Sequence, residues 1–133
     1  MKKLIGLLVC VLVTLGVVAA QEKTTPAADQ GIKVEKIVAA TSVANLEPVG
    51  ENKEFDASVG TVTCWTKVTA KTVPATIKHV WYFGDKKVFE HPLDLKFAST
   101  RTWSTKSVKP GSWKVDVTDD AGAVLSSVSF TVK

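Results

Sequence analysis

The chain has 133 residues, of which 45% are hydrophobic and 23% are charged, and this length suits one compact domain with its own core. Its 17 basic and 13 acidic residues give a net charge of +4, to which Lys2 and Lys3 contribute two charges. The other basic residues are not gathered into the footprint that a nucleic acid requires, so we expect no nucleic-acid partner.

Residues 1–20 have the pattern of an export signal. Two lysines precede an apolar run from Leu4 to Val18, and two small alanines precede Gln21. This order predicts a helical signal peptide that is cleaved before Gln21, and a mature protein that is periplasmic or secreted. The alternative is an uncleaved anchor, for which the run is close to the shortest usable length. Only then would the protein contact the membrane.

The remaining chain divides into a short linker and a β-rich domain. Residues 21–31 have few large apolar side chains and predict a flexible linker. Residues 32–133 consist of runs rich in Val, Thr, Trp and Phe, separated by Gly, Pro and Asp, which predicts one all-β domain. We expect seven strands, at Ile32–Ser42, Val59–Thr69, Ile77–Phe83, Lys86–Leu95, Thr100–Val108, Ser112–Asp119 and Ala123–Val132. Seven strands in about a hundred residues fit a sandwich of two antiparallel sheets.

Two segments have the composition of tight turns. Gly84 and Asp85 suit a two-residue hairpin turn, in which glycine tolerates positive φ. Asp119 suits the start of a type I turn, and Gly122 suits the left-handed position that follows. The turn at Gly84 predicts the cross-strand pairs Phe83 with Lys86, Trp81 with Val88, and His79 with Glu90.

Alternation of side chains predicts the core. Trp113, Val115 and Val117 alternate with polar residues, so one face of their strand is apolar. Cys64 is the one cysteine that remains after cleavage, and it belongs to an apolar alternation of its own strand. We therefore expect Cys64 to be a buried thiol without a disulfide partner.

The positions of Cys64, Trp81 and Trp113 resemble an immunoglobulin-type sandwich that lacks its disulfide, with Val115 in place of the second cysteine. More specifically, residues 32–133 resemble the bacterial family called domain of unknown function 2914. The likeness lies in the segments His79–Trp81, Arg101–Lys106, Gly111–Val117 and Asn45–Val49. The resemblance implies the fold and an exported or membrane-attached protein, and it implies no established reaction.

A polar cluster is the first candidate site. His79 would pair with Glu90 and share a face with Trp81, and Arg101 would share a face with Trp103. The three polar side chains could then meet at one end of an aromatic core. They would form either an ion network that fixes strand register or a pocket for an anion or ligand.

A zinc site is the sharper chemical hypothesis. His79 and His91 with Glu90 or Asp94 would supply ligands for a metal-assisted hydrolase. In the register above, however, the two histidines project from opposite faces, and a bulge would be needed to unite them. We therefore expect no bound metal and no cofactor.

An aromatic patch is the third candidate site. If Cys64 is buried, Trp65 points the other way, and Tyr82 is opposite in phase to Trp81. Trp65 and Tyr82 would then form an exposed surface for a sugar, a peptide or a partner protein, unless a loop or strand covers them.

The sequence as a whole favours an exported, non-enzymatic interaction or accessory module of the cell envelope, with an envelope protein or a glycan as its partner. No serine lies in a Gly-x-Ser-x-Gly elbow, and no glycine-rich phosphate loop is present. The alternatives are a small carbohydrate-binding module and the metal-assisted hydrolase.

Overall fold

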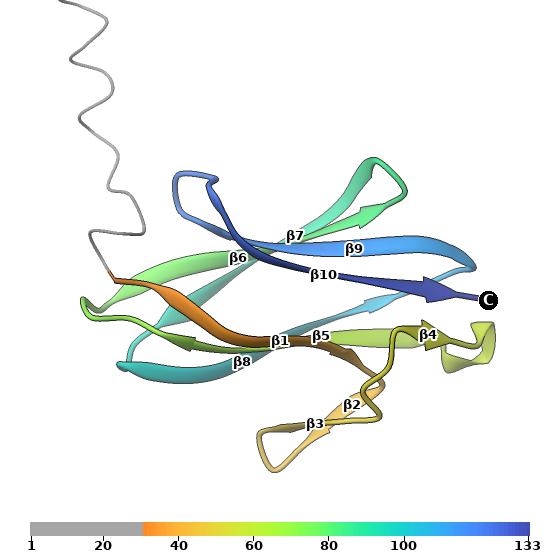
Figure 1. Ribbon diagram of the computed structural model, residues 1–133, viewed down its shortest axis with the longest axis horizontal. Helices are drawn as coiled ribbons and strands as arrows, with labels where there is room; N and C mark the ends of the chain where they lie inside the picture. Colours follow the sequence, from red (N-terminus) through yellow and green to blue (C-terminus); the bar gives the residue numbers. More distant parts are fainter. Residues whose placement is uncertain (1–30) are drawn as a thin grey trace, which may run out of the picture.

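The computed structural model describes residues 31–133. The predicted signal peptide and the linker up to residue 30 lie outside the described residues. Figure 1 shows a domain built of strands, and within residues 31–133 no helix is long and apolar enough to cross a membrane. The strands are β1 (Lys33–Ala40), β2 (Ser42–Ala44), β3 (Glu47–Val49), β4 (Glu54–Phe55), β5 (Thr61–Thr69), β6 (Ala75–Phe83), β7 (Lys86–Leu95), β8 (Ser99–Ser107), β9 (Gly111–Asp119) and β10 (Val124–Val132).

The seven long strands agree with the predicted ones to within two residues at every end. The first ends at Ala40 rather than Ser42, because the chain turns away at Thr41 to form β2. The expected count of seven strands is wrong, since β2, β3 and β4 are additional. These three have only two or three residues each, which is too short for a visible alternation pattern.

Two sheets form the main layers of the fold. One contains three strands in the order β1-β5-β8, and the other contains five in the order β4-β10-β9-β6-β7. Their pairings are antiparallel, except that β4 runs parallel to β10. Figure 1 shows the two layers facing each other across the core.

A small hairpin of β2 and β3 makes the third sheet. It projects from the three-stranded layer on the side away from the core (Figure 1). Its turn places Asn45 and Leu46 at φ values of 55° and 66°. Positive φ is accessible to asparagine but is strained for a branched side chain such as leucine.

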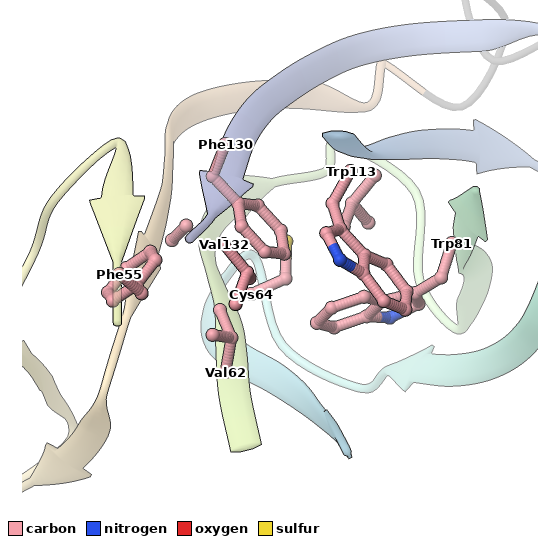
Figure 2. Packing of buried hydrophobic residues seen from close by; sticks show 9 residues of the cluster. Phe55, Val62, Cys64, Trp81, Trp113, Phe130 and Val132 are labelled. Carbon is pink, nitrogen blue, oxygen red and sulfur yellow. The ribbon is translucent and has the colours of Figure 1, made fainter. Parts of the chain in front are cut away.

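The larger part of the core is aromatic. Trp81, Trp113 and Phe130 pack with ring centres 6.1 to 6.5 Å apart, and Phe55 packs edge-on against Phe130. Figure 2 shows these rings with Val62 and Cys64 from the opposite sheet. The expectation that Cys64 is buried and unpaired is confirmed, and Cys64 packs in one cluster with Trp81 and Val115.

A second, smaller cluster fills the other end of the space between the sheets. It is aliphatic and contains Val68, Ala70, Ala75, Ile77, Leu95 and Val117. Both clusters draw residues from both sheets, so each helps to hold the layers together.

The β6–β7 hairpin has the expected turn but not the expected register. Phe83 pairs with Lys86 across Gly84 and Asp85, as predicted. Val88 is then an extra residue on β7, so Trp81 pairs with Phe89 and His79 with His91. A bulge of this kind leaves no trace in the apolar pattern, because it shifts the pairing by one residue within a strand that remains extended. The predicted pairs Trp81–Val88 and His79–Glu90 are therefore wrong.

The turn between β9 and β10 is as predicted. The Asp119 side chain accepts hydrogen bonds from the backbone N–H groups of Ala121 and Ala123, at 3.0 and 2.8 Å. Gly122 takes the positive φ of 94° that the turn requires. The carboxylate at Asp119 thus serves to shape the turn.

Candidate functional site

A chain of hydrogen bonds links the two sheets through His79. The Trp81 Nε1–H donates to Ser104 Oγ at 3.0 Å, and Ser104 Oγ lies 2.7 Å from His79 Nδ1. On the other side of the ring, His79 Nε2 lies 3.2 Å from Thr66 Oγ1, and the Thr66 hydroxyl donates to the Thr102 carbonyl at 3.0 Å. His79 and Trp81 belong to β6, whereas the other three residues belong to β5 and β8.

The direction of the bonds fixes the tautomer of His79. The indole N–H of Trp81 can only donate, so the single hydroxyl proton of Ser104 is free to go to His79 Nδ1. Because the Thr66 proton is already given to Thr102, Thr66 Oγ1 must accept from the Nε2–H of the ring. The neutral Nε2–H form of His79 therefore satisfies every member of the chain.

Burial keeps His79 neutral. Loss of solvation, with a smaller contribution from His91, lowers the pKa of His79 to about 3. A serine donating to a histidine is also the arrangement of an activated nucleophile. Here, however, both side chains are buried between the sheets, and neither lines any of the grooves described below. The geometry therefore supports a structural bridge between the layers.

The bulge in β7 brings His91 opposite His79, so the expectation that they lie on opposite faces is wrong. Glu90 and Asp94 lie on the other face of β7. Across residues 31–133, no group of three or more His, Cys, Asp or Glu side chains could hold a metal ion. Both ring nitrogens of His79 are also engaged by hydroxyl groups.

The predicted cluster of His79, Glu90 and Arg101 does not form. Glu90 lies on the outer face of the five-stranded sheet, 2.8 Å from Lys87 and 3.5 Å from Lys78. The hydrogen bond from Lys87, and then its charge, lower the pKa of Glu90, and the same contact raises the pKa of Lys87. Arg101 pairs with Glu47 of β3 at 3.2 Å on the outer face of the other sheet.

The predicted aromatic patch does not form either. Trp65 is 2% exposed, because the β2–β3 hairpin lies over it and the Leu46 carbonyl accepts its Nε1–H at 3.0 Å. The alternation argument was correct about direction, since Trp65 does point away from Cys64. Tyr82 is half-buried on the outer face of the other sheet, with Lys114 Nζ 4.7 Å from its ring centre. Trp65 and Tyr82 therefore lie on opposite sides of the molecule.

A groove opens at the end of β8, between the two sheets. It has a volume of about 360 Å³ and combines apolar side chains with two lysines. Lys109 Nζ lies 4.6 Å from the centre of the Phe83 ring, and Lys106 Nζ lies 5.8 Å from that of Phe89. Neither lysine forms an ion pair with any residue in 31–133. We call this the Val88 groove; its lining residues are Phe83, Val88, Lys106, Ser107, Val108, Lys109 and Trp113.

A second groove, of about 410 Å³, lies at the start of β8 on the outer face of the sheet. We call it the Leu46 groove, and Leu46, Phe97, Ser99, Thr100 and Arg101 line it. Leu46 is 53% exposed and Phe97 is 69% exposed. Two large apolar side chains in water beside a guanidinium are typical of a binding surface.

Residues 74–132 match the family described as protein of unknown function, DUF2914. No curated protein matches the chain. The resemblance seen in the sequence is therefore confirmed over β6 to β10, which contain three of the four segments that suggested it. The fourth segment, Asn45–Val49, lies outside the match.

The DUF2914 segment contains β8 and every residue that lines the Val88 groove. It also supplies Phe97 and Arg101 of the Leu46 groove, whereas Leu46 itself comes from the preceding part of the chain. Both grooves thus flank a strand of the matched segment.

Sequence reasoning missed both grooves. Their exposed apolar residues, Leu46, Val88 and Phe97, stand in loops or at a bulge, where no periodicity marks them as exposed. One signal was available: Asn45-Leu46 occupies a hairpin turn in which glycine is usual at the second position. A large apolar residue there indicates that something other than turn stability selects it.

Proposed function

We propose that this protein is an exported, non-enzymatic interaction module of the bacterial cell envelope, with an immunoglobulin-like fold. The observation that carries the proposal is the pair of grooves at the two ends of β8. Each presents apolar side chains to solvent next to cations, and Lys106 and Lys109 have no carboxylate partner within residues 31–133. Proteins seldom leave such surfaces without a partner.

The arrangement of the long strands supports the immunoglobulin-like assignment. In chain order, the first, second and fifth long strands form one sheet, and the third, fourth, sixth and seventh form the other. An immunoglobulin constant domain has the same division, except that its fourth strand lies beside the fifth. The hydrogen bonds through His79 would then join the two sheets near the place where immunoglobulin domains have a disulfide.

Site-specific photo-crosslinking tests the interaction function. A photoreactive amino acid is placed at Lys109, or at Lys53 as a control on the opposite edge, in the full chain expressed in its own bacterium. We expect discrete adducts from position 109 and none from position 53. The absence of adducts at 109, with the protein abundant and folded, would contradict the proposal. The intact mass of the same purified protein tests export, which predicts a chain that begins at Gln21.

One observation favours the glycan alternative. On the outer face of the five-stranded sheet, a groove of about 420 Å³ is lined by the hydroxyls of Ser112, Ser129 and Thr131 beside Trp113. Hydroxyl groups in a shallow groove can hydrogen-bond a saccharide. Titration of tryptophan fluorescence with a glycan panel tests this possibility: a saturable change that is lost in Ser129→Asp would favour it over a protein partner.

A further inference from the structure

The two main sheets have four edges that a partner strand could pair with, and three of these edges are interrupted. β1 carries a bulge at Glu35, β10 carries one at Leu125, and β7 carries one at Val88 as well as Pro92 within the strand. Bulges and prolines are the usual devices that prevent edge strands from pairing with other chains. β4 also covers the last residues of β10.

β8 lacks these devices. All nine of its residues pair with β5 in one unbroken register, from Ser99 with Thr69 to Ser107 with Thr61. It is the end strand of its sheet, so half of its backbone N–H and C=O groups point away from β5. The strand contains no proline and extends for about 30 Å, at about 3.3 Å per residue. This edge is ready to receive another strand.

The charges along this edge define the partner. Neither β5 nor β8 contains an aspartate or a glutamate, whereas Lys67, Arg101 and Lys106 lie on them. Arg101 is paired with Glu47, but Lys67 and Lys106 have no ion pair within the described domain. Lys106 shares the inward phase of its β5 partner, Val62, so a neutral or basic strand laid over it would desolvate an uncompensated ammonium. A strand with carboxylates would neutralise it.

The two grooves supply places for apolar side chains. An added strand would project successive side chains to opposite faces of the sheet. The Leu46 groove lies on the outer face at one end of β8, and the Val88 groove lies on the inner face at the other end. One extended segment could therefore reach both grooves. Trp103, half-buried in the middle of the outer face, would be covered on the way.

We propose that β8 receives an extended segment of a partner protein, rich in acidic and apolar residues, which adds to the three-stranded sheet as its fourth strand. This inference rests on the proposed interaction function and specifies its mode. A second copy of the chain is a poorer occupant, because its β8 carries no carboxylate that could pair with Lys106.

A synthetic peptide tests the mode of binding directly. The probe has nine residues, the length of β8, in the order Val-Val-Glu-Glu-Val-Val-Glu-Glu-Val, so that each face of the added strand carries both valine and glutamate. We expect saturable binding at neutral pH that weakens with added salt and changes Trp103 fluorescence. Amide hydrogen exchange followed by NMR should show new protection in β8, and not in β1, β7 or β10.

Two controls separate strand addition from charge attraction. A copy of the peptide with alternate amides N-methylated keeps the charges but cannot complete the ladder, and we expect it to bind at least about tenfold more weakly, equivalent to about 1.4 kcal/mol. The Lys106→Glu variant should also lose at least about tenfold, whereas Lys53→Glu, on the opposite edge, should bind within about twofold of the parent. Thermal unfolding establishes that both variants are folded.

Four results would overturn the inference: no binding at millimolar peptide, equal binding of the N-methylated copy, protection on another edge, or a peptide-free dimer with β8 protected. If cross-links form at position 109 while the peptide fails, the interaction function stands and strand addition is wrong. If the peptide protects β8 while no adduct forms in the cell, strand addition is a property of the fold and the proposed function is wrong.

Discussion

The two halves of the core consist of different kinds of side chain. The half around Trp81 and Trp113 is aromatic, whereas the half around Ile77 and Leu95 is aliphatic. Along β6 the inward residues run Ile77, His79, Trp81, so a histidine separates the two halves. The same order occurs on β5, where Thr66 stands between Val68 and Cys64.

This contrast separates two roles: the hydrogen-bonded residues specify how the layers align, and the apolar residues supply most of the buried volume. Apolar side chains in both halves stabilise the contact between layers with little dependence on direction. The hydrogen-bond chain of Trp81, Ser104, His79 and Thr66, which we call the His79 belt, instead requires each donor to meet one acceptor. No buried side-chain nitrogen or oxygen in residues 31–133 is left without a partner. We therefore expect the belt to set how the layers align, and the aromatic half to contribute most of the free energy of unfolding.

Trp81→Ala should have the largest effect. It removes a fully buried indole that touches Trp113 and Phe130, and it also removes the donor to Ser104. We expect the free energy of unfolding to fall by about 3–5 kcal/mol, as measured by urea denaturation.

Trp81→Phe separates the two contributions. It keeps most of the ring packing but leaves Ser104 without its indole donor, so we expect a loss of about 1–2 kcal/mol. If Trp81→Ala and Trp81→Phe were equally stable, the aromatic half would not contribute most of the free energy of unfolding.

Acid should weaken the belt. An unfolded histidine titrates near pH 6.5, whereas the pKa of folded His79 is about 3, so between these values only the unfolded chain takes up the proton. The contribution of neutral His79 is complete above pH 6.5 and is lost as the pH falls towards 3. The expected slope is about 1.4 kcal/mol per pH unit, measured by urea denaturation across that range.

His79→Gln isolates this contribution from that of the carboxylates, because the amide does not titrate. The difference in stability between the parent and His79→Gln should shrink steadily below pH 6.5. His91→Gln, on the neighbouring strand, should retain most of the slope. A pH profile of His79→Gln parallel to that of the parent would mean that His79 is already protonated in the folded protein.

Ile77→Val tests the aliphatic half with a smaller change. It removes one methylene group from a fully buried side chain, and we expect a loss of about 0.5–1.5 kcal/mol in the free energy of unfolding. The pH slope should be unchanged, since the belt is intact. A changed slope would show that the aliphatic half and the belt are not independent.

The sequence predicts the long strands and the core because both depend on alternation. Trp113, Val115 and Cys64 are buried as their phase indicates. The predictions of the candidate sites were wrong for two physical reasons. The extra residue Val88 shifts His79 from Glu90 to His91, and a hairpin too short to recognise covers Trp65. Pairing partners and coverage depend on contacts between distant segments, which one strand's pattern does not contain.

The smallest expected effect concerns the surface, where stability and binding should oppose each other. Leu46 holds a positive φ of 66° in a turn that favours Asn-Gly. Leu46→Gly removes that strain at some entropic cost, so we expect a stabilisation of about 0.5–1 kcal/mol by thermal unfolding.

The same change removes an apolar wall of the Leu46 groove, so the acidic peptide should bind more weakly to Leu46→Gly than to the parent. Gly122→Ala, in the unrelated β9–β10 turn at φ 94°, is the matched control: it should lose stability and leave binding unchanged. A more stable Leu46→Gly with undiminished binding would mean that the strained leucine serves neither the fold nor the groove. A more stable Leu46→Gly with weaker binding would explain why a residue that lowers stability stands in a turn where glycine fits better.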